Sequence, residues 1–122
     1  MSEAELTDEE KRQMRLGSYF RLVKLAREGL GLEVPRYTRV DAVKRLVEAE
    51  LSARLTKVGI VNGVTIRYTT AAPSWAGKSA LVTDATISWN QEVPVVKLVM
   101  EGKQRTHTYY ALHVLEHAAV EQ

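Results

Sequence analysis

The chain contains no cysteine, and this one absence removes several classes of site. Without thiolates there is no disulfide framework, no cysteine-ligated zinc finger, no iron–sulfur centre and no cysteine nucleophile. Only three prolines, two tryptophans and one phenylalanine occur among 122 residues. The chain therefore has no proline-rich tract, and no internal repeat or low-complexity segment is visible.

Long apolar runs and a secretion signal are absent too. No stretch approaches the roughly 18 apolar residues that a helix needs to cross a bilayer. The first residues, Met1 to Glu5, are acidic and are not followed by the apolar core of a signal peptide. We therefore expect a cytoplasmic protein. With 45% hydrophobic and 26% charged residues, the composition predicts one globular domain over residues 1–122.

The net charge is only +2, but it is distributed unevenly. Residues 1–10 hold five acids and no base, residues 11–57 hold twelve bases and five acids, and residues 58–122 hold five of each. Attraction to an anionic partner must therefore come from the middle segment, unless its bases are only the solvated faces of two helices. The bases that we nominate for phosphate contacts are Arg12, Arg15, Arg21, Lys24, Arg27, Arg36, Arg39, Lys44 and Arg45.

The first predicted helix runs from about residue 8 to residue 28. Thr7 to Glu10 matches a capping box, and Gly29 and Gly31 are stop signals. Apolar residues recur at helical spacing and predict one buried side. They are Leu16, Tyr19, Phe20, Val23, Ala26 and Leu30.

The second predicted helix runs from about residue 39 to residue 56, after a second capping pattern at Thr38 to Asp41. It carries two apolar stripes, and a helix that is apolar on two flanks has two neighbours. One stripe is Val40, Val43, Val47 and Leu51. The other is Ala42, Leu46, Ala49 and Ala53, which we predict to be a protein interface, either with the rest of the domain or with a second copy of the chain.

From residue 58 onward the pattern changes to alternation. Asn62-Gly63 between β-branched residues predicts a type I′ hairpin turn. Further strands are expected at about 64–69, 80–89, 93–100 and 104–112, and from His113 the chain is expected to leave the sheet with a helical turn or more.

The predicted fold class is α+β. It comprises a two-helix segment over 7–57, a five-stranded antiparallel small barrel or bent sheet over 58–115, and a tail over 116–122.

Part of this pattern resembles a known fold. Gly77 to Asp84, Val95 to Leu98, Gly102, and Tyr110 to Leu112 are together similar to an SH3-like small barrel of the KOW type, over roughly the last third to half of the chain. The resemblance implies a module that binds nucleic acid, ribosomal or transcription proteins, or peptides. It also implies contacts made by the barrel loops, which carry Trp75 and Lys78.

Residues 72–79 match a relaxed Walker A spacing that ends in Gly77-Lys78-Ser79. A P-loop needs glycine-rich amides followed by a helix whose N-terminus points at the phosphates. Here Pro73 removes one amide and Trp75 crowds the loop, and the residues that follow are typical of a strand. We therefore expect a surface loop and no nucleotide site.

His113 to His117 matches the H-x-x-E-H pattern of inverted zinc peptidases. Two histidines at i and i+4 on a helix can chelate zinc, but a catalytic site needs a third ligand and a walled cleft. Only one acid, Glu121, follows. We therefore predict no metal site and leave metal binding by the pair open.

Four aromatic residues, Trp75, Trp89, Tyr109 and Tyr110, either stack single-stranded bases or belong to the core, and the core is the favoured interpretation. No constellation of acid, base and nucleophile is recognisable. The sequence therefore predicts a non-enzymatic binding or regulatory protein without a cofactor. Its leading partner is nucleic acid, bound through the phosphate backbone. The alternative is a protein–protein module, such as a homodimeric regulator or host-factor binder.

Overall fold

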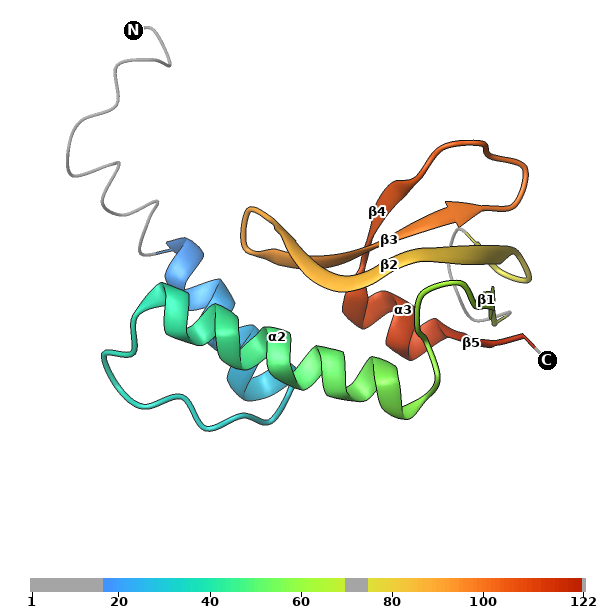
Figure 1. Cartoon of the computed structure of the whole chain (residues 1–122). Helices are drawn as coiled ribbons and strands as arrows, with labels where there is room; N and C mark the ends of the chain where they lie inside the picture. Colours follow the sequence, from blue (N-terminus) through green and yellow to red (C-terminus); the bar gives the residue numbers. More distant parts are fainter. Residues whose placement is uncertain (1–16, 70–74, 122) are drawn as a thin grey trace, which may run out of the picture. The chain divides into compact units, whose positions relative to one another are not determined.

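The computed structural model describes residues 17–69 and 75–121 (Figure 1). The chain divides into two compact units, residues 1–47 and residues 48–122. We call the described part of the first the helical unit and the described part of the second the sheet unit. None of the described helices is both long and apolar enough to cross a membrane.

The helical unit begins with one helix that widens toward its end. Residues 17–24 are α-helical and continue into the π-helix η1 (Leu25–Gly29). Leu30 N donates to Leu25 O at 3.0 Å, which is the wider π spacing. Gly31 then takes φ +67, so the helix ends where the glycines predict. The predicted capping box at Thr7 to Glu10 lies outside the described residues.

Two hydrogen bonds fix the connection that follows this helix. The Arg27 Nη2 donates to Val34 O at 2.5 Å, and the Tyr19 hydroxyl donates to Thr38 O at 2.8 Å. One prediction about the buried side is wrong, because Phe20 is 64% exposed while Leu22 is buried. The buried side chains of the helical unit are Leu22, Val23, Ala26, Leu30, Val34, Val43 and Val47.

The second helix, α2 (Val40–Lys57), lies within one residue of the predicted bounds. Its buried stripe starts one turn later than predicted, since Val40 is 42% exposed while Val43 is fully buried. The predicted cap at Thr38 is also wrong. The Thr38 hydroxyl donates to Pro35 O at 2.5 Å, and Val43 N closes the first helical turn on Arg39 O.

The sheet unit confirms the α+β class with a five-stranded antiparallel sheet in the order β4-β3-β2-β1-β5. The strands are β1 (Thr65–Tyr68), β2 (Ser79–Asn90), β3 (Val93–Met100), β4 (His107–Tyr110) and β5 (Ala118–Val120). A third helix, α3 (Ala111–His117), lies between β4 and β5. The prediction of two helices is therefore wrong. The sheet is not a closed barrel, because no ladder joins β4 to β5 among the described residues.

The long strand β2 is irregular in its middle. Its pairing with β3 shifts register between Val82 and Asp84 and again between Asp84 and Ser88. Such bulges bend a strand and increase its twist. Ala85 N, in the irregular segment, donates to the Asn62 side-chain oxygen at 2.7 Å. Of the two predicted forms, a small barrel or a bent sheet, the bulges of β2 support the bent sheet.

The Asn62-Gly63 pair forms a turn, but not the predicted hairpin. Val64 N donates to Val61 O at 3.3 Å and Gly63 takes φ +88, whereas Asn62 is not among the described residues with positive φ. A type I′ turn needs positive φ at both residues. The segment before the turn is not a strand; the fifth strand is β5, within the predicted tail, where Ile66 pairs with Val120.

Candidate functional site

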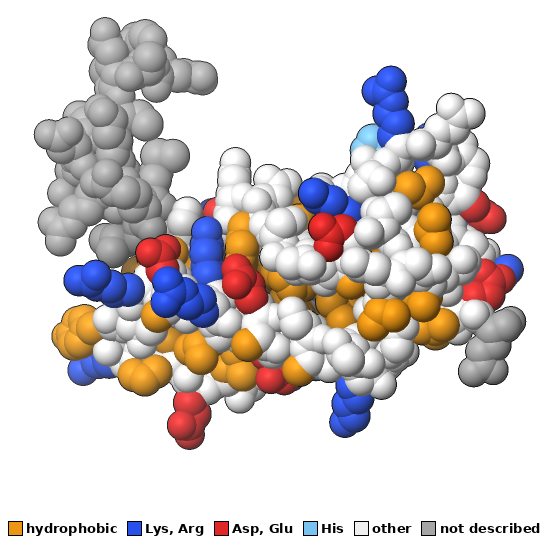
Figure 2. Space-filling view, in the orientation of Figure 1, with side chains coloured by type: hydrophobic (Ala, Val, Ile, Leu, Met, Phe, Trp, Pro, Cys, Tyr) orange, Lys and Arg blue, Asp and Glu red, His pale blue; other side chains and the backbone are white. Residues whose placement is uncertain are grey.

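Seven of the nine nominated bases are described, and all seven lie in the helical unit. Six are exposed and Lys44 is half-buried, while Arg12 and Arg15 lie outside the described residues. Residues 17–47 contain seven bases and three acids, a net charge of +4, whereas residues 48–121 contain seven of each. The exposed bases are Arg21, Lys24, Arg27, Arg36, Arg39 and Arg45. Figure 2 shows Lys and Arg side chains scattered over the face in view, with acidic and hydrophobic side chains between them.

The internal contact of Lys24 is weak. The Lys24 ammonium lies 3.9 Å from the Glu28 carboxylate, with side chains 76% and 70% exposed. Such a surface pair is weak and is easily exchanged for another anion. Arg27 is different, since one of its guanidinium nitrogens holds Val34 O. Arg27 therefore supports the fold of the connection as well as contributing charge.

An exposed aromatic side chain adjoins these bases. Tyr37 is 86% exposed, and the Arg36 guanidinium carbon lies 5.7 Å from the centre of its ring. Tyr37 also has φ +66. For a non-glycine residue this backbone region costs about 1 to 2 kcal/mol, and burial of the ring does not compensate for it. The Tyr37 ring is therefore exposed beside an arginine on a strained backbone.

Phe20 is the second exposed ring of the helical unit. Its ring lies 6.0 Å from that of Tyr19 in an edge-to-face arrangement. The Tyr19 hydroxyl holds Thr38 O, so the segments that carry Phe20 and Tyr37 are joined by one hydrogen bond. Sequence reasoning assigned Phe20 to the core and did not single out Tyr37. The available signal was the Arg36-Tyr37 pair directly after Pro35, in a connection rather than in a helix.

The predicted protein interface on α2 is accessible along most of its length. Leu46 is 40% exposed, Ala49 and Ala53 are exposed, and Ala42 is half-buried. No partner is present, so the assignment of this stripe to an interface stays a prediction.

The sheet unit gathers a second set of aromatic side chains, which we call the aromatic–histidine cluster: Tyr68, Trp75, Tyr109, His113 and His117. The Trp75 ring lies 5.7 Å from Tyr68, 5.4 Å from Tyr109 and 5.5 Å from His113. The predicted loop contact Trp75 is thus half-buried among other rings. Lys78, the other one, is exposed.

Burial dominates the electrostatics of this cluster. The Tyr68 hydroxyl is buried and has no hydrogen-bond partner in the part of the chain that the structure describes. Burial, with a smaller contribution from Tyr109, raises the pKa of Tyr68 to about 12. Burial also lowers the pKa of His113, and the neighbouring His117 lowers it further.

The segment that matches the Walker A spacing does not have the structure of a P-loop. Gly77 takes φ +75, and the residues after Lys78 form strand β2 rather than a helix. A phosphate at this loop would therefore find no helix N-terminus.

The four aromatic residues considered as a stacking platform have different environments. The indole Nε1 of Trp89 donates to Glu48 Oε1 at 2.6 Å, and Trp89 is half-buried. Tyr110 is 58% exposed, whereas Tyr109 is half-buried against Trp75. Most of these rings are thus packed rather than presented to a ligand.

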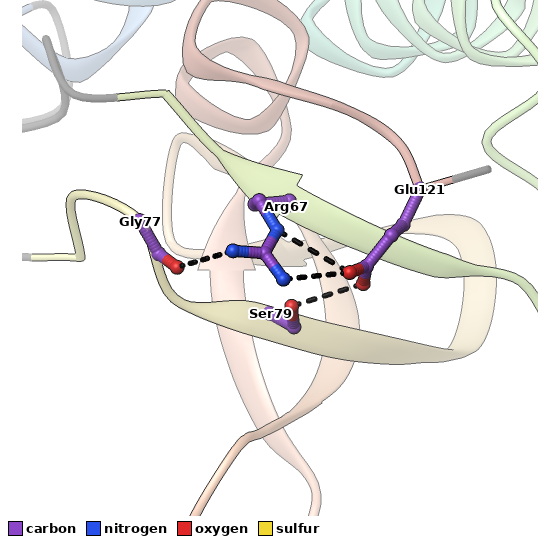
Figure 3. A network of polar contacts seen from close by, with 4 residues as sticks. All are labelled: Arg67, Gly77, Ser79 and Glu121. Atoms are coloured by element: carbon purple, nitrogen blue, oxygen red, sulfur yellow. Dashed lines mark hydrogen bonds and ion pairs between the residues drawn. The ribbon is translucent and has the colours of Figure 1, made fainter.

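An exposed polar network ties three neighbouring strands together (Figure 3). The Arg67 guanidinium on β1 lies 2.7 Å from Glu121 Oε1 and donates to Gly77 O at 3.4 Å. The Ser79 hydroxyl donates to Glu121 Oε2 at 3.0 Å. Hydrogen bonds from Arg67 and then Ser79 lower the pKa of Glu121. In this network the charges of Arg67 and Glu121 pair with each other, and the contacts hold β5 on the sheet.

Within residues 17–69 and 75–121, no three or more His, Asp or Glu side chains are grouped so that they could hold a metal ion. The sites above thus comprise an exposed basic surface on the helical unit and a packed cluster in the sheet unit. Comparison of the chain with protein-family models, curated proteins and solved structures gives no match.

Proposed function

We propose that the protein is a non-enzymatic nucleic-acid-binding protein whose helical unit binds the phosphate backbone. The observation that carries this proposal is the set of six exposed basic side chains between Arg21 and Arg45, in a unit with a net charge of +4. Each base that neutralises a phosphate releases a counterion and contributes to affinity. The equal numbers of acids and bases over residues 48–121 give the sheet unit no such attraction.

The exposed rings of the helical unit favour single-stranded nucleic acid. Tyr37 and Phe20 are 86% and 64% exposed, and flat rings beside arginines stack on unpaired bases of any sequence. Phosphate contacts themselves carry no sequence information. We therefore propose binding with little sequence specificity and with a preference for single strands over duplexes.

For the sheet unit we propose membership of the SH3-like small barrels. Three features support it: the antiparallel order with β5 beside β1, the bent β2 shared by the two halves of the sheet, and the short helix α3 before the last strand. We propose that this unit serves as a scaffold or protein-contact module and does not itself hold the nucleic acid.

The test is fluorescence anisotropy of labelled single-stranded and duplex oligonucleotides at increasing salt. Wild type is expected to bind the single strand more tightly, with affinity that falls steeply as salt rises. Charge reversal of Arg21 and Lys24 together is expected to weaken binding by about tenfold or more. Salt-independent binding, or no binding at low salt, contradicts the proposal.

A second candidate function is self-association through α2. The observation that favours it is the exposure of Leu46, Ala49 and Ala53 on one side of that helix. Light scattering after size exclusion is expected to give a dimer that Ala49→Arg converts to a monomer. A wild-type monomer at high protein concentration contradicts this candidate.

A further inference from the structure

Helix α3 places two histidine side chains against each other. His113 and His117 are four residues apart on α3, and their ring centres lie 4.7 Å apart. Side chains at this spacing share one face of a helix. Two histidines at this spacing on one helix are able to bind one metal ion together.

The backbone that carries the pair is fixed at both ends. A helix of seven residues is too short to be stable alone in water. Here β4 precedes α3 and β5 follows it, and both strands are paired in the sheet. Thr69 N donates to His117 O at 2.7 Å, and Val114 is fully buried beneath the helix. The two histidines are therefore held on a rigid element.

Packing also restrains the His113 ring. Its centre lies 5.7 Å from the ring of Tyr68 and 5.5 Å from that of Trp75. His117 is also half-buried, and 28% of its side chain is exposed. The His113 ring is thus supported by neighbouring rings, and the His117 ring remains partly open to solvent. A metal site needs this combination of fixed ligand geometry and an entry path.

A carboxylate accompanies the pair. Glu116 Oε2 lies 3.7 Å from His117 Nε2, and the Glu116 side chain is 65% exposed. At this distance the carboxylate makes no hydrogen bond to the ring, but it adds negative charge close to a cation bound there.

We propose that His113 and His117 form a two-histidine site for a divalent transition metal ion of the kind that imidazole prefers, Cu²⁺ or Zn²⁺. Neutral imidazole suits these ions, whereas Mg²⁺ and Ca²⁺ prefer oxygen ligands. With two protein ligands, water occupies the other coordination positions, so the ion is exchangeable. Cu²⁺ binds more tightly than Zn²⁺ because it stands higher in the general affinity order of nitrogen ligands. The site departs from the sequence-based prediction of no metal, and it does not depend on nucleic-acid binding.

The experiment is isothermal titration of the full, untagged chain with CuCl₂, ZnCl₂ and MgCl₂. Wild type is expected to bind one Cu²⁺ or one Zn²⁺ per chain, and no Mg²⁺. His113→Ala and His117→Ala are each expected to weaken affinity by about tenfold or more. The matched control is His107→Ala, because His107 is the third histidine of the chain and lies exposed on β4. Its affinity is expected to equal that of wild type.

Removing the packed His113 ring could unfold the sheet unit, so His117→Ala carries the test. Its circular dichroism melt is expected to match that of wild type while metal affinity falls. Electron paramagnetic resonance of bound Cu²⁺ should show nitrogen coordination in wild type that is lost in His117→Ala. The proposal is overturned if wild type binds neither ion, if His117→Ala leaves affinity unchanged, or if His107→Ala weakens affinity as much as His117→Ala.

Discussion

The two units of this chain use the same residue types in opposite ways. In the helical unit, Tyr37 is 86% exposed beside Arg36, and the bases outnumber the acids by four. In the sheet unit, Tyr68 is 1% exposed among other rings, and Arg67 is engaged by Glu121. The difference teaches that charge and aromatic content alone do not mark a ligand-binding surface. Under the proposed function, what marks it is the exposure of aromatic and basic side chains in the helical unit.

The largest expected effect tests whether the sheet unit is held by its core. Leu98→Ala on β3 removes a fully buried side chain and should lower the free energy of unfolding by about 3 kcal/mol. Leu81→Ala on β2 is the matched control, because Leu81 is 44% exposed and should change stability by less than about 0.5 kcal/mol. Urea denaturation measures both variants. Equal losses in the two would show that the described packing is wrong.

The next effect concerns the buried tyrosine hydroxyl. Tyr68→Phe removes a polar group without a described partner and should raise the free energy of unfolding by about 1 kcal/mol near neutral pH. The raised pKa also predicts a pH effect. The fold favours the neutral phenol over the phenolate. The free energy of unfolding of wild type should therefore be highest below pH 10 and should fall as pH rises toward about 12. Denaturation across this range should show the fall in wild type, and a Tyr68→Phe variant with an equal fall would contradict the assignment.

Two residues with strained backbones allow an effect on binding to be distinguished from an effect on stability. Tyr37 and Gln91, one in each unit, are the described non-glycine residues with positive φ, at +66 and +58. Glycine at either position should stabilise the chain by about 1 kcal/mol, because it adopts positive φ without a steric cost. Tyr37→Gly should also weaken nucleic-acid binding severalfold, whereas Gln91→Gly should leave it unchanged. If both variants bind as wild type does, Tyr37 has no role in binding.

The smallest effect is expected at the polar network of β1, β2 and β5. Its hydrogen bonds lower the pKa of Glu121 below the ordinary value of 4.5. The ionised carboxylate is therefore favoured in the fold. Its contribution is complete above the unfolded pKa and is lost as pH falls through the lower folded pKa. Glu121→Gln should reduce the loss of stability below pH 4.5. The control Glu33→Gln, at an exposed carboxylate of the helical unit outside this network, should retain the wild-type profile.

Patterns with a clear physical period were predicted best from the sequence. The bounds of α2 and of the strands β2 and β3 lie close to those predicted. In long segments, the regular spacing of apolar residues indicates both the type of element and its buried face. The strand β5 was missed because three residues carry no readable alternation, and pairing with β1 is what orders them. The count of five strands is right, but the hairpin predicted at Asn62-Gly63 needs a strand before the turn, and none forms there. The fifth strand is β5.

The candidate sites were predictable only in part. The basic segment could be identified from the sequence, because the net charge of each segment is counted directly from its residues. The exposure of Phe20 and Tyr37 was hidden, since Phe20 lies at apolar helical spacing and a single ring in a connection, such as Tyr37, has no period to interpret. The spacing of His113 and His117 was visible in the sequence. Their close approach depends on α3 forming between two strands, which only tertiary pairing decides.

The most direct test of the central claim compares two charge reversals of equal size in single-strand binding as salt is varied. Arg36→Glu with Arg39→Glu changes the helical unit, and Lys103→Glu with Arg105→Glu changes exposed bases of the sheet unit by the same net charge. We predict that the first pair lowers affinity by about tenfold or more and reduces the salt slope by about two phosphate contacts. The second pair should keep the wild-type slope. Equal losses from both pairs, or a larger loss from the second, would contradict a nucleic-acid interface on the helical unit.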